Sequence, residues 1–253
     1  MIDQTFPGEI SPRVEVRVQS GNVRLVPGEA KSVRVVAEAH KDAGLEVSKR
    51  GATIVVSTDK GGWFRNDKAD ITIYVPESTE ASINAASADV RVTTPLSRLE
   101  VNTATGDITF ATVGSLEVRT ASGDVRGDRV TESVRVVGAS GDVQINSCSG
   151  KASFSSASGD VEIGHCQGGS LKTSTASGDV SVALCQSSEV ECKSMSGDVD
   201  LGIPPRTRVS LDASTLSGNV RLPEPSESSE PPESSMSIKV RLVSGDMRLF
   251  RAG

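Results

Sequence analysis

The chain has 253 residues, of which 36% are hydrophobic and only 3% are aromatic. This composition excludes a conventional core of bulky rings, while the regular recurrence of Val, Ile and Leu excludes a disordered chain. The formal net charge of −6 argues against non-specific binding to nucleic acid or anionic lipid, because the long-range field has the wrong sign.

Residues 1–10 show neither the basic region nor the apolar stretch of a secretory leader. No run in the chain approaches the roughly 18 apolar residues that a membrane helix needs. We therefore expect no direct membrane insertion and a cytoplasmic protein with reduced cysteines, or an exported protein if a leader has been removed from this sequence.

Residues 1–86 are rich in β-branched residues and predict strands at residues 32–39, 52–58 and 70–75. The loop between the last two strands carries Trp63 and Phe64. These rings are expected either to anchor a protein partner or to cap an open flank of the fold. We interpret the region as irregular N-terminal rungs of the fold that follows, or as a distinct lobe of it.

Residues 87–222 carry a short repeat: Ser or Thr, then Gly, then Asp or Asn, then an apolar residue. The pattern occurs ten times in the whole chain, and from residue 88 to residue 197 successive copies are 17 to 19 residues apart. Its glycine-like positions are Gly21, Ala88, Gly106, Gly123, Gly141, Gly159, Gly178, Gly197, Gly218 and Gly245.

Short strands flank each glycine-like position. Apolar residues stand two and four places after it with a polar residue between them, as in Val180, Ser181 and Val182. Further apolar columns stand seven and five places before it. This alternation is typical of strands with one buried face. Two places before the glycine alanine dominates, which predicts a tight inner corner.

A unit this short cannot bury its apolar face alone, so copies are expected to stack as parallel strands about 4.8 Å apart. The predicted fold is all-β: a single-stranded parallel β-solenoid, similar to a β-helix, with rungs of about 18 residues. A right-handed coil is expected from the handedness of parallel crossovers. Helical spacing is absent from the sequence.

Residues 223–235 are dense in Pro, Ser and Glu and predict an acidic loop. This loop is either a solvated insertion, a dock for a basic partner or a phosphorylation site. The chain then returns over residues 236–253 as a C-terminal rung, and Phe250 is expected on the terminal strand of the stack.

With these serial Ser-Gly-Asp-Val units, and with a strand that ends in Val75-Pro76 before the corner at Asp89, the sequence resembles the toastrack family. These are bacterial β-strand-repeat domains of unknown function, some of them described as candidate adhesins. The resemblance covers roughly residues 10–250. It implies a β-helix-like fold and a non-enzymatic role in adhesion, envelope-stress sensing or protein assembly, and it provides no catalytic residues.

The corner aspartates should form a ladder on one edge of the stack. In most such corners an aspartate bonds the backbone of its own turn, and the alternative is a cation-binding ladder that makes a calcium-stiffened module. The expected ladder consists of Asp89, Asp107, Asp124, Asp142, Asp160, Asp179 and Asp198.

Cys148, Cys166 and Cys185 each stand seven places after a corner glycine and should share one column. Small buried apolar side chains are the simplest reading of this column, and Cys192 falls among valines. A zinc or redox site that includes His165 is the alternative. However, adjacent residues of a strand face opposite sides, so His165 should point away from Cys166.

We found none of the sequence patterns of a catalytic triad, a metalloprotease or a phosphate-binding loop. We expect no cofactor, no metal and no enzymatic activity. The preferred interpretation is a structural or interaction protein that contacts a protein partner, or another copy through the terminal rungs, with Trp63, Phe64 and Phe250 as contact residues. The alternative is a polysaccharide-active β-helix enzyme that uses carboxylates such as Asp124, Asp142 and Glu162.

Overall fold

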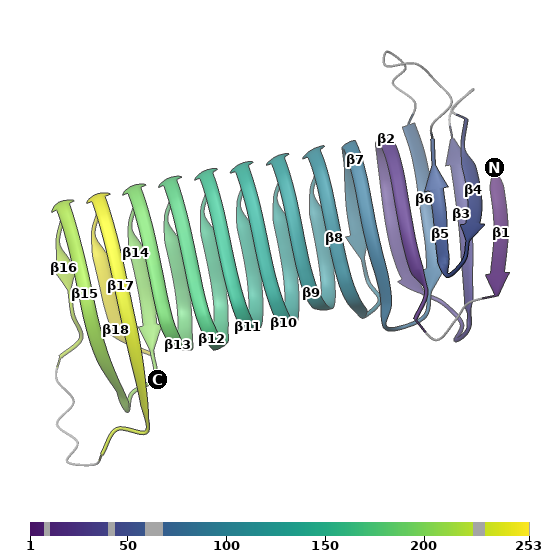
Figure 1. Ribbon diagram of the computed structural model, residues 1–253. Helices are drawn as coiled ribbons and strands as arrows, with labels where there is room; N and C mark the ends of the chain where they lie inside the picture. Colours follow the sequence, from purple (N-terminus) through teal and green to yellow (C-terminus); the bar gives the residue numbers. More distant parts are fainter. Residues whose placement is uncertain (8–10, 40–43, 59–67, 225–230, 253) are drawn as a thin grey trace. The chain divides into compact units, whose positions relative to one another are not determined.

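The computed structural model describes residues 1–7, 11–39, 44–58, 68–224 and 231–252. Every regular element in these ranges is a β-strand, so the predicted all-β class is confirmed (Figure 1). The chain divides into two compact units, Met1–Arg129 and Val130–Gly253, which are described separately. This division does not coincide with the predicted change of region at residue 86. None of the described residues belongs to a helix that could cross a membrane.

Unit 1 contains nine complete strands and the start of a tenth. They are β1 (Ile2–Pro7), β2 (Arg13–Pro27), β3 (Ser32–Ala39), β4 (Glu46–Arg50), β5 (Thr53–Ser57), β6 (Lys68–Val75), β7 (Thr79–Val92), β8 (Leu96–Thr105), β9 (Ile108–Ser122) and the first residues of β10 (Val125–Ser140).

Unit 2 contains the rest of β10 and the last eight strands. They are β11 (Val143–Ser158), β12 (Val161–Ser177), β13 (Val180–Ser196), β14 (Val199–Ile203), β15 (Thr207–Ser217), β16 (Val220–Arg221), β17 (Ser234–Ser244) and β18 (Met247–Arg251).

The repeats of unit 2 stack in register as parallel strands. Val161 and Ile163 of β12 lie beside Val180 and Val182 of β13, and all four side chains are buried. Each strand alternates buried and exposed residues, as the period of two predicted. The strand is continuous from one corner to the next. The predicted parallel β-solenoid is confirmed.

The corner glycines are required by both backbone angle and stacking. Gly178 has a φ of 137°, which side chains other than hydrogen rarely allow. A Cβ at this position would lie 2.2 Å from the carbonyl oxygen of Gly159 in the preceding rung. The corner at Gly178 thus rests directly on the corner at Gly159, and only glycine permits this approach there.

The last rungs of unit 2 do not stack in sequence order. β17 pairs with β13 on one side and with β15 on the other, and β18 lies likewise between β14 and β16. The end of the chain therefore fills the place next to β13 and β14, and β15 with β16 forms the outermost rung (Figure 1). The expectation that Phe250 lies on the terminal strand of the stack is wrong, because β18 is the second rung from the end.

β2, the second strand of the chain, is also inserted between strands that come later in the sequence. β2 pairs in parallel with β7 on one side, and with β5 and β6 on the other. Beyond them the pairing turns antiparallel, since β4 pairs with β5, β3 with β6 and β1 with β3. The three strands expected in this region are present. β5 and β6 pair in parallel with β2 as a rung does, and antiparallel pairs lie next to them. The description of residues 1–86 as irregular rungs or a distinct lobe stays a prediction.

One corner of unit 1 escaped the sequence analysis. Ala69, Asp70 and Ile71 lie beside Gly21, Asn22 and Val23, so they occupy the corner columns. Lys68-Ala69-Asp70-Ile71 differs from the repeat by having alanine in place of glycine, as at Ala88, and lysine in place of the preceding Ser or Thr. This similarity to the Ala88 corner could have identified the corner at Ala69 from the sequence.

The alanine column two places before each glycine faces outward, so the predicted tight inner corner is wrong. Ala157 and Ala176 are exposed, whereas the residues that precede them, Ser156 and Thr175, are more buried. The parity of the strand decides this, because residues at an odd offset from the glycine point inward before the corner. The column forms part of the protein surface.

Candidate functional site

The aspartate column of unit 2 is a continuous chain of hydrogen bonds between rungs. The backbone N–H of Asp160 donates to Oδ1 of Asp142 at 3.0 Å, and the N–H of Asp179 donates to Oδ1 of Asp160 at 2.8 Å. The same bond joins Asp198 to Asp179 and Asp246 to Asp198, each at 2.8 Å. Each carboxylate thus supplies an acceptor to the rung that follows it in space.

Unit 1 contains the same arrangement. The N–H of Asp107 donates to Asp89 and the N–H of Asp124 donates to Asp107, both at 3.0 Å. The expected bond to the aspartate's own turn is thus replaced, in these ladders, by a bond across rungs. The physical reason is that the sharp corner interrupts the backbone ladder, and the neighbouring carboxylate supplies the missing acceptor.

The asparagines in the column lie where the stack changes. Asn219 belongs to the outermost rung, and its backbone N–H donates to Oδ1 of Asp246 at 2.8 Å. No described rung follows it, and its side chain donates from Nδ2 to the same Oδ1 at 3.3 Å. Asn22 likewise donates its Nδ2 to Asp70, at 2.5 Å. An amide satisfies these positions without adding a further negative charge to the edge.

The ladder geometry is unfavourable for a cation. One oxygen of each carboxylate is already an acceptor in the stack, and calcium takes six to eight oxygen ligands. Across the described ranges, no group of three or more His, Cys, Asp or Glu side chains is arranged to hold a metal ion. The calcium-stiffened module therefore gains no support from this edge.

The cysteine column is formed as the spacing predicted. Cys148 lies beside Cys166, and Cys166 lies beside Cys185, with all three side chains at most 1% exposed. A hydrogen bond with Cys148, and then burial, raises the pKa of Cys166 to about 12. Bonding to Cys166 and burial also raise the pKa of Cys185. The hydrogen bond with Cys166 lowers the pKa of Cys148. All three thiols are buried in the core, so they lack the access that reactive cysteines have.

His165 does not join the cysteines. It lies outside the core at intermediate exposure, and its Nε2 is 2.9 Å from Oε1 of Gln186 and 3.1 Å from Nε2 of Gln167. The thiol of Cys166 points inward and lies 3.4 Å from the hydroxyl of Ser187. The strand alternation therefore separates the imidazole from the thiols, as expected.

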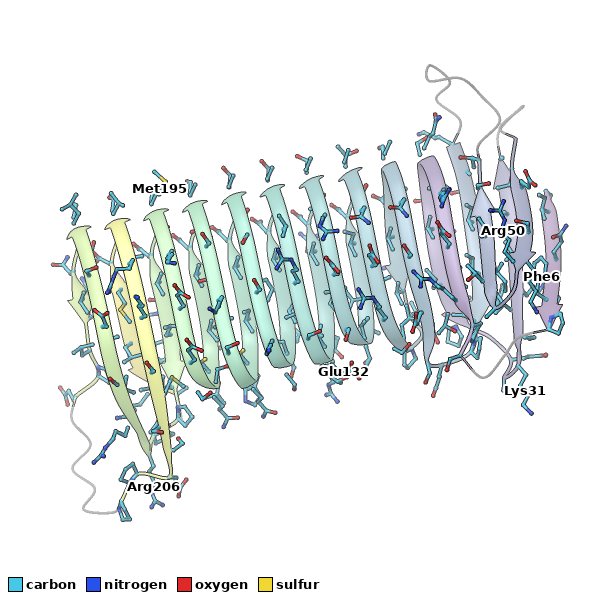
Figure 2. All side chains as sticks on the ribbon, in the orientation of Figure 1. Phe6, Lys31, Arg50, Glu132, Met195 and Arg206 are labelled. Atoms are coloured by element: carbon cyan, nitrogen blue, oxygen red, sulfur yellow. The ribbon has the colours of Figure 1, made fainter. Side chains whose placement is uncertain are left out.

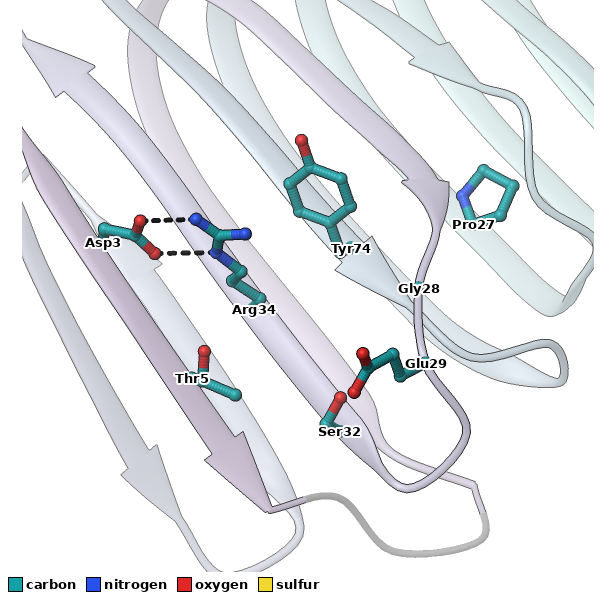
Figure 3. A pocket seen from close by; sticks show the side chains of 8 residues that line it. All are labelled: Asp3, Thr5, Pro27, Gly28, Glu29, Ser32, Arg34 and Tyr74. Carbon is teal, nitrogen blue, oxygen red and sulfur yellow. Dashed lines mark hydrogen bonds and ion pairs between the residues drawn. The ribbon is translucent and has the colours of Figure 1, made fainter.

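Unit 1 has a polar hollow of about 600 Å³ over the outer faces of β1, β3 and β6 (Figure 3). Thr5 lies beside Arg34, and Arg34 lies beside Tyr74, across the antiparallel strands. Arg34 forms a bidentate ion pair with Asp3 at 2.6 and 2.9 Å and lies 5.7 Å from the centre of the Tyr74 ring. No sequence pattern indicates this site, because only antiparallel pairing brings these distant residues together.

The hollow is not organised for acid–base catalysis. The hydrogen bond from Arg34 lowers the pKa of the Asp3 carboxyl, so this group is ionised and both its oxygens are occupied. A general acid needs the opposite shift. Glu29 lines the other side of the hollow (Figure 3). The lining can form hydrogen bonds to a polar ligand.

The carboxylates named for a polysaccharide-active enzyme lie on sheet faces and corners. Asp124 pairs with Arg126 at 2.6 Å, and Glu162 accepts a hydrogen bond from Gln144 at 3.1 Å. Asp142 belongs to the ladder of unit 2. None of the three lines a hollow found among the described residues.

Two of the three predicted contact residues, Trp63 and Phe64, lie outside the described residues. The third, Phe250, is half-buried on β18, where its ring packs beside Gly202 and under the guanidinium of Arg248, 5.3 Å away. Its packing is explained within unit 2, so its role as a partner contact remains a prediction.

The outermost rung of unit 2 is open. The inward residues of β17, Ile238 and Val240, are 1% exposed, whereas their neighbours on β15, Leu211 and Ala213, are only half-buried. The next column shows the same change: Val220 is 40% exposed beside buried Met247. No described strand pairs with the outer side of β15. We call β15 and β16 together the open end.

A second apolar surface lies on the corner edge of the same rungs. The outward alanine column of Ala139, Ala157 and Ala176 continues as Met195, Val243 and Leu216 in the last three rungs. These three side chains are 63%, 50% and 85% exposed, and Met195 projects from the edge in Figure 2. We call Met195, Val243 and Leu216 the corner ridge. Neither surface was predicted. The open end depends on the order of the last rungs, and the ridge belongs to a column that was expected to face an inner corner.

The chain was compared with known proteins. A family model described as Toastrack DUF4097 matches residues 12–249. No curated protein matches. Crystal structures with a similar fold include a candidate adhesin from Bacteroides fragilis, with 15% identity, a TM-score of 0.44 and coverage of 98% of this chain and 96% of that one.

Two further structures come from Parabacteroides distasonis. A candidate lipid-binding protein has 17% identity and a TM-score of 0.46, with 97% of each chain covered. A candidate adhesin has 10% identity and a TM-score of 0.46, with 99% of this chain and 96% of that one covered. The family match extends over most of the sequence and agrees with the stacked Ser-Gly-Asp corners. The chain is therefore a member of the toastrack family.

Proposed function

We propose that the chain is a non-enzymatic interaction module that binds a protein partner by strand addition at the open end. The half-buried interior of the outermost rung carries this proposal. Leu211 lies in a column whose other members in unit 2 are fully buried, so a strand added to β15 would complete its burial. The resemblance to the toastrack family implies an assembly in adhesion or envelope stress as the setting.

The edge of β15 provides the second part of the contact. It is an 11-residue strand whose outer side meets no described strand, and such an edge is a template for pairing with another chain. Main-chain hydrogen bonds would give affinity, and the half-buried Val209, Leu211 and Ala213 would select alternate apolar side chains of the added strand. The partner is thus expected to offer an extended segment with an apolar residue at every second position.

Site-specific photocrosslinking tests this function. A photoreactive residue at Ser210, on the outward side of β15, should form covalent adducts with protein in cells that express the full chain. The same residue at Ser181, on the exposed face of β13, is the matched control. Leu211→Lys should remove the adducts, because a charge would have to be buried under the added strand. If Ser210 captures no more protein than Ser181, or if Leu211→Lys leaves the adducts unchanged, the proposal is wrong.

A further inference from the structure

The corner edge of the last rungs carries three parallel rows of different chemistry. The corner ridge forms the apolar row. In two of the three chain segments a cation, Lys193 or Arg241, stands two residues before the ridge, and a carboxylate, Asp198 or Asp246, stands three residues after it. In the segment of Leu216 these places hold Ser214 and Asn219. The chain crosses the corner in the same direction in each rung. The order across the edge is therefore cation, apolar side chain, carboxylate in both rungs that carry all three.

This order is self-complementary under one symmetry operation. A two-fold axis that runs along the ridge, between two copies, exchanges the flanks while it leaves each rung opposite its own counterpart. Lys193 then faces the partner's Asp198, Arg241 faces the partner's Asp246, and Met195 faces the partner's Met195. An axis across the ridge would instead place cations against cations, which is unfavourable.

We propose that the corner ridge is a self-association surface at which two copies of this chain meet side by side, with parallel ridges and exchanged charge rows. The contact is isologous, as in most closed dimers. Its apolar centre removes three exposed side chains from water, and these belong to the few large hydrophobic residues left exposed in the described ranges.

The neighbouring ion pairs do not prevent this exchange. Lys193 lies 2.7 Å from Glu191, and Arg241 forms a bidentate contact with Asp212, but the cations keep further donors. Both contacts are solvent-exposed, where ion pairs contribute little to stability. On the other flank, Oδ1 of Asp198 accepts the N–H of Asp246, while Oδ2 remains available for the facing lysine. Oδ1 of Asp246 accepts the N–H of Asn219, and its Oδ2 lies 3.8 Å from Nη2 of Arg221, an exposed pair that contributes little to stability.

Shape agrees with a contact limited to the last rungs. A shallow apolar groove of about 490 Å³ lies along the edge and is bordered by Ala157 and Ala176 on one stretch and by Met195 and Val243 on the next. Long side chains therefore occur in this column only in the last rungs, where we place the contact, and the alanines of the earlier rungs leave space next to it. An interface this small is expected to give a weak dimer that depends on concentration.

Cysteine crosslinking distinguishes the two possible ridge directions. Met195→Cys should form a disulfide-linked dimer under copper–phenanthroline oxidation, because residue 195 faces its own counterpart within disulfide range. Leu216→Cys should do the same. The natural cysteines are buried and should not react. Ser181→Cys, exposed on the other face of β13, is the matched control and should give only the background of random collisions.

Charge variants test the exchanged rows. Lys193→Glu would place like charges opposite each other and should raise the dimer dissociation constant, measured by sedimentation equilibrium, at least about tenfold. In that background Asp198→Asn should recover part of the lost affinity, because it removes the carboxylate that faces the introduced glutamate. The ladder is kept, since the amide oxygen still accepts the N–H of Asp246. Leu211→Lys should leave the crosslink unchanged, so failure here is distinguishable from failure of the open-end contact.

The proposal is overturned if Met195→Cys yields no more covalent dimer than Ser181→Cys. It is also overturned if a mixture of Met195→Cys and Leu216→Cys crosslinks better than either variant alone, since that result would show antiparallel ridges. A dissociation constant that Lys193→Glu leaves unchanged would likewise contradict it.

Discussion

Oδ1 of Asp179 accepts the backbone N–H of Asp198 at 2.8 Å, which joins one corner of unit 2 to the next. The Asp179 carboxylate thus binds a rung other than its own. The backbone carbonyl of Asp179 accepts the N–H of Val161, in the rung on the other side, at 2.9 Å. One residue therefore bonds in both directions along the stack. The repeat of aspartate in the sequence follows from this bonding, because each rung needs an acceptor from its predecessor.

Asp179→Ala should destabilise unit 2 by about 0.5–1.5 kcal/mol, since the N–H of Asp198 loses its protein acceptor. Asp179→Asn keeps a carbonyl oxygen in the same place and should remain within about 0.5 kcal/mol of the wild type. The free energy of unfolding in urea measures both. Equal losses in the two variants would show that charge, rather than the acceptor, is what the position requires.

Gly178→Ala should cost at least about 2 kcal/mol, because the new Cβ meets the Gly159 carbonyl at 2.2 Å and the backbone has a φ of 137°. The matched control is Gly169→Ala. Nothing lies within 4 Å of a Cβ at Gly169, so this change should be close to neutral. Similar thermal shifts for the two variants would contradict the close stacking of corners.

Leu201→Ala and Leu222→Ala compare one column in two rungs. Leu201 is fully buried on β14, and its truncation should cost about 2–5 kcal/mol. Leu222 is 59% exposed beside the open end, and its truncation should cost less than about 1 kcal/mol. Urea denaturation of the two variants gives the comparison. A large loss at Leu222 would mean that another segment covers the open end.

Hydrogen exchange can establish the order of the last rungs without any substitution. Amides of β17 should exchange slowly, because this strand is bonded to β13 and to β15 on its two sides. Amides of β15 should exchange faster, since this strand lies at an edge. Mass spectrometry of peptides from residues 207–217 and 234–244 measures the two rates. The opposite order would indicate stacking in sequence order.

Cys192 should make the protein sensitive to alkaline pH. Burial raises the pKa of this thiol to about 12 from its ordinary value of 9.0. A raised pKa in the folded state means that the stabilisation is complete below pH 9 and is lost as the pH rises from about 9 toward 12. Cys192→Val should reduce this loss, because valine fills the same column in Val240. Melting temperatures across this pH range measure the difference.

Local patterns in the amino-acid sequence are enough to identify the repeating unit. Alternation on both sides of the Ser-Gly-Asp corner identified the strands, their parallel stacking and the buried columns that contain Cys166 and Phe154. These features follow from local geometry, since a strand has a period of two and only glycine allows the corner to approach its neighbour. The aspartate ladder could be placed on one edge for the same reason, although its bonding partner could not be identified.

The order of the rungs along the stack is known only from the tertiary structure. β2 and β17 each lie between strands that do not neighbour them in the sequence. Because the columns repeat, every rung presents nearly the same side chains to the rung beside it. The pattern therefore fixes the register within a rung but not the order of the rungs. That order leaves Leu211 half-buried at the open end and places Val243 between Met195 and Leu216 in the corner ridge.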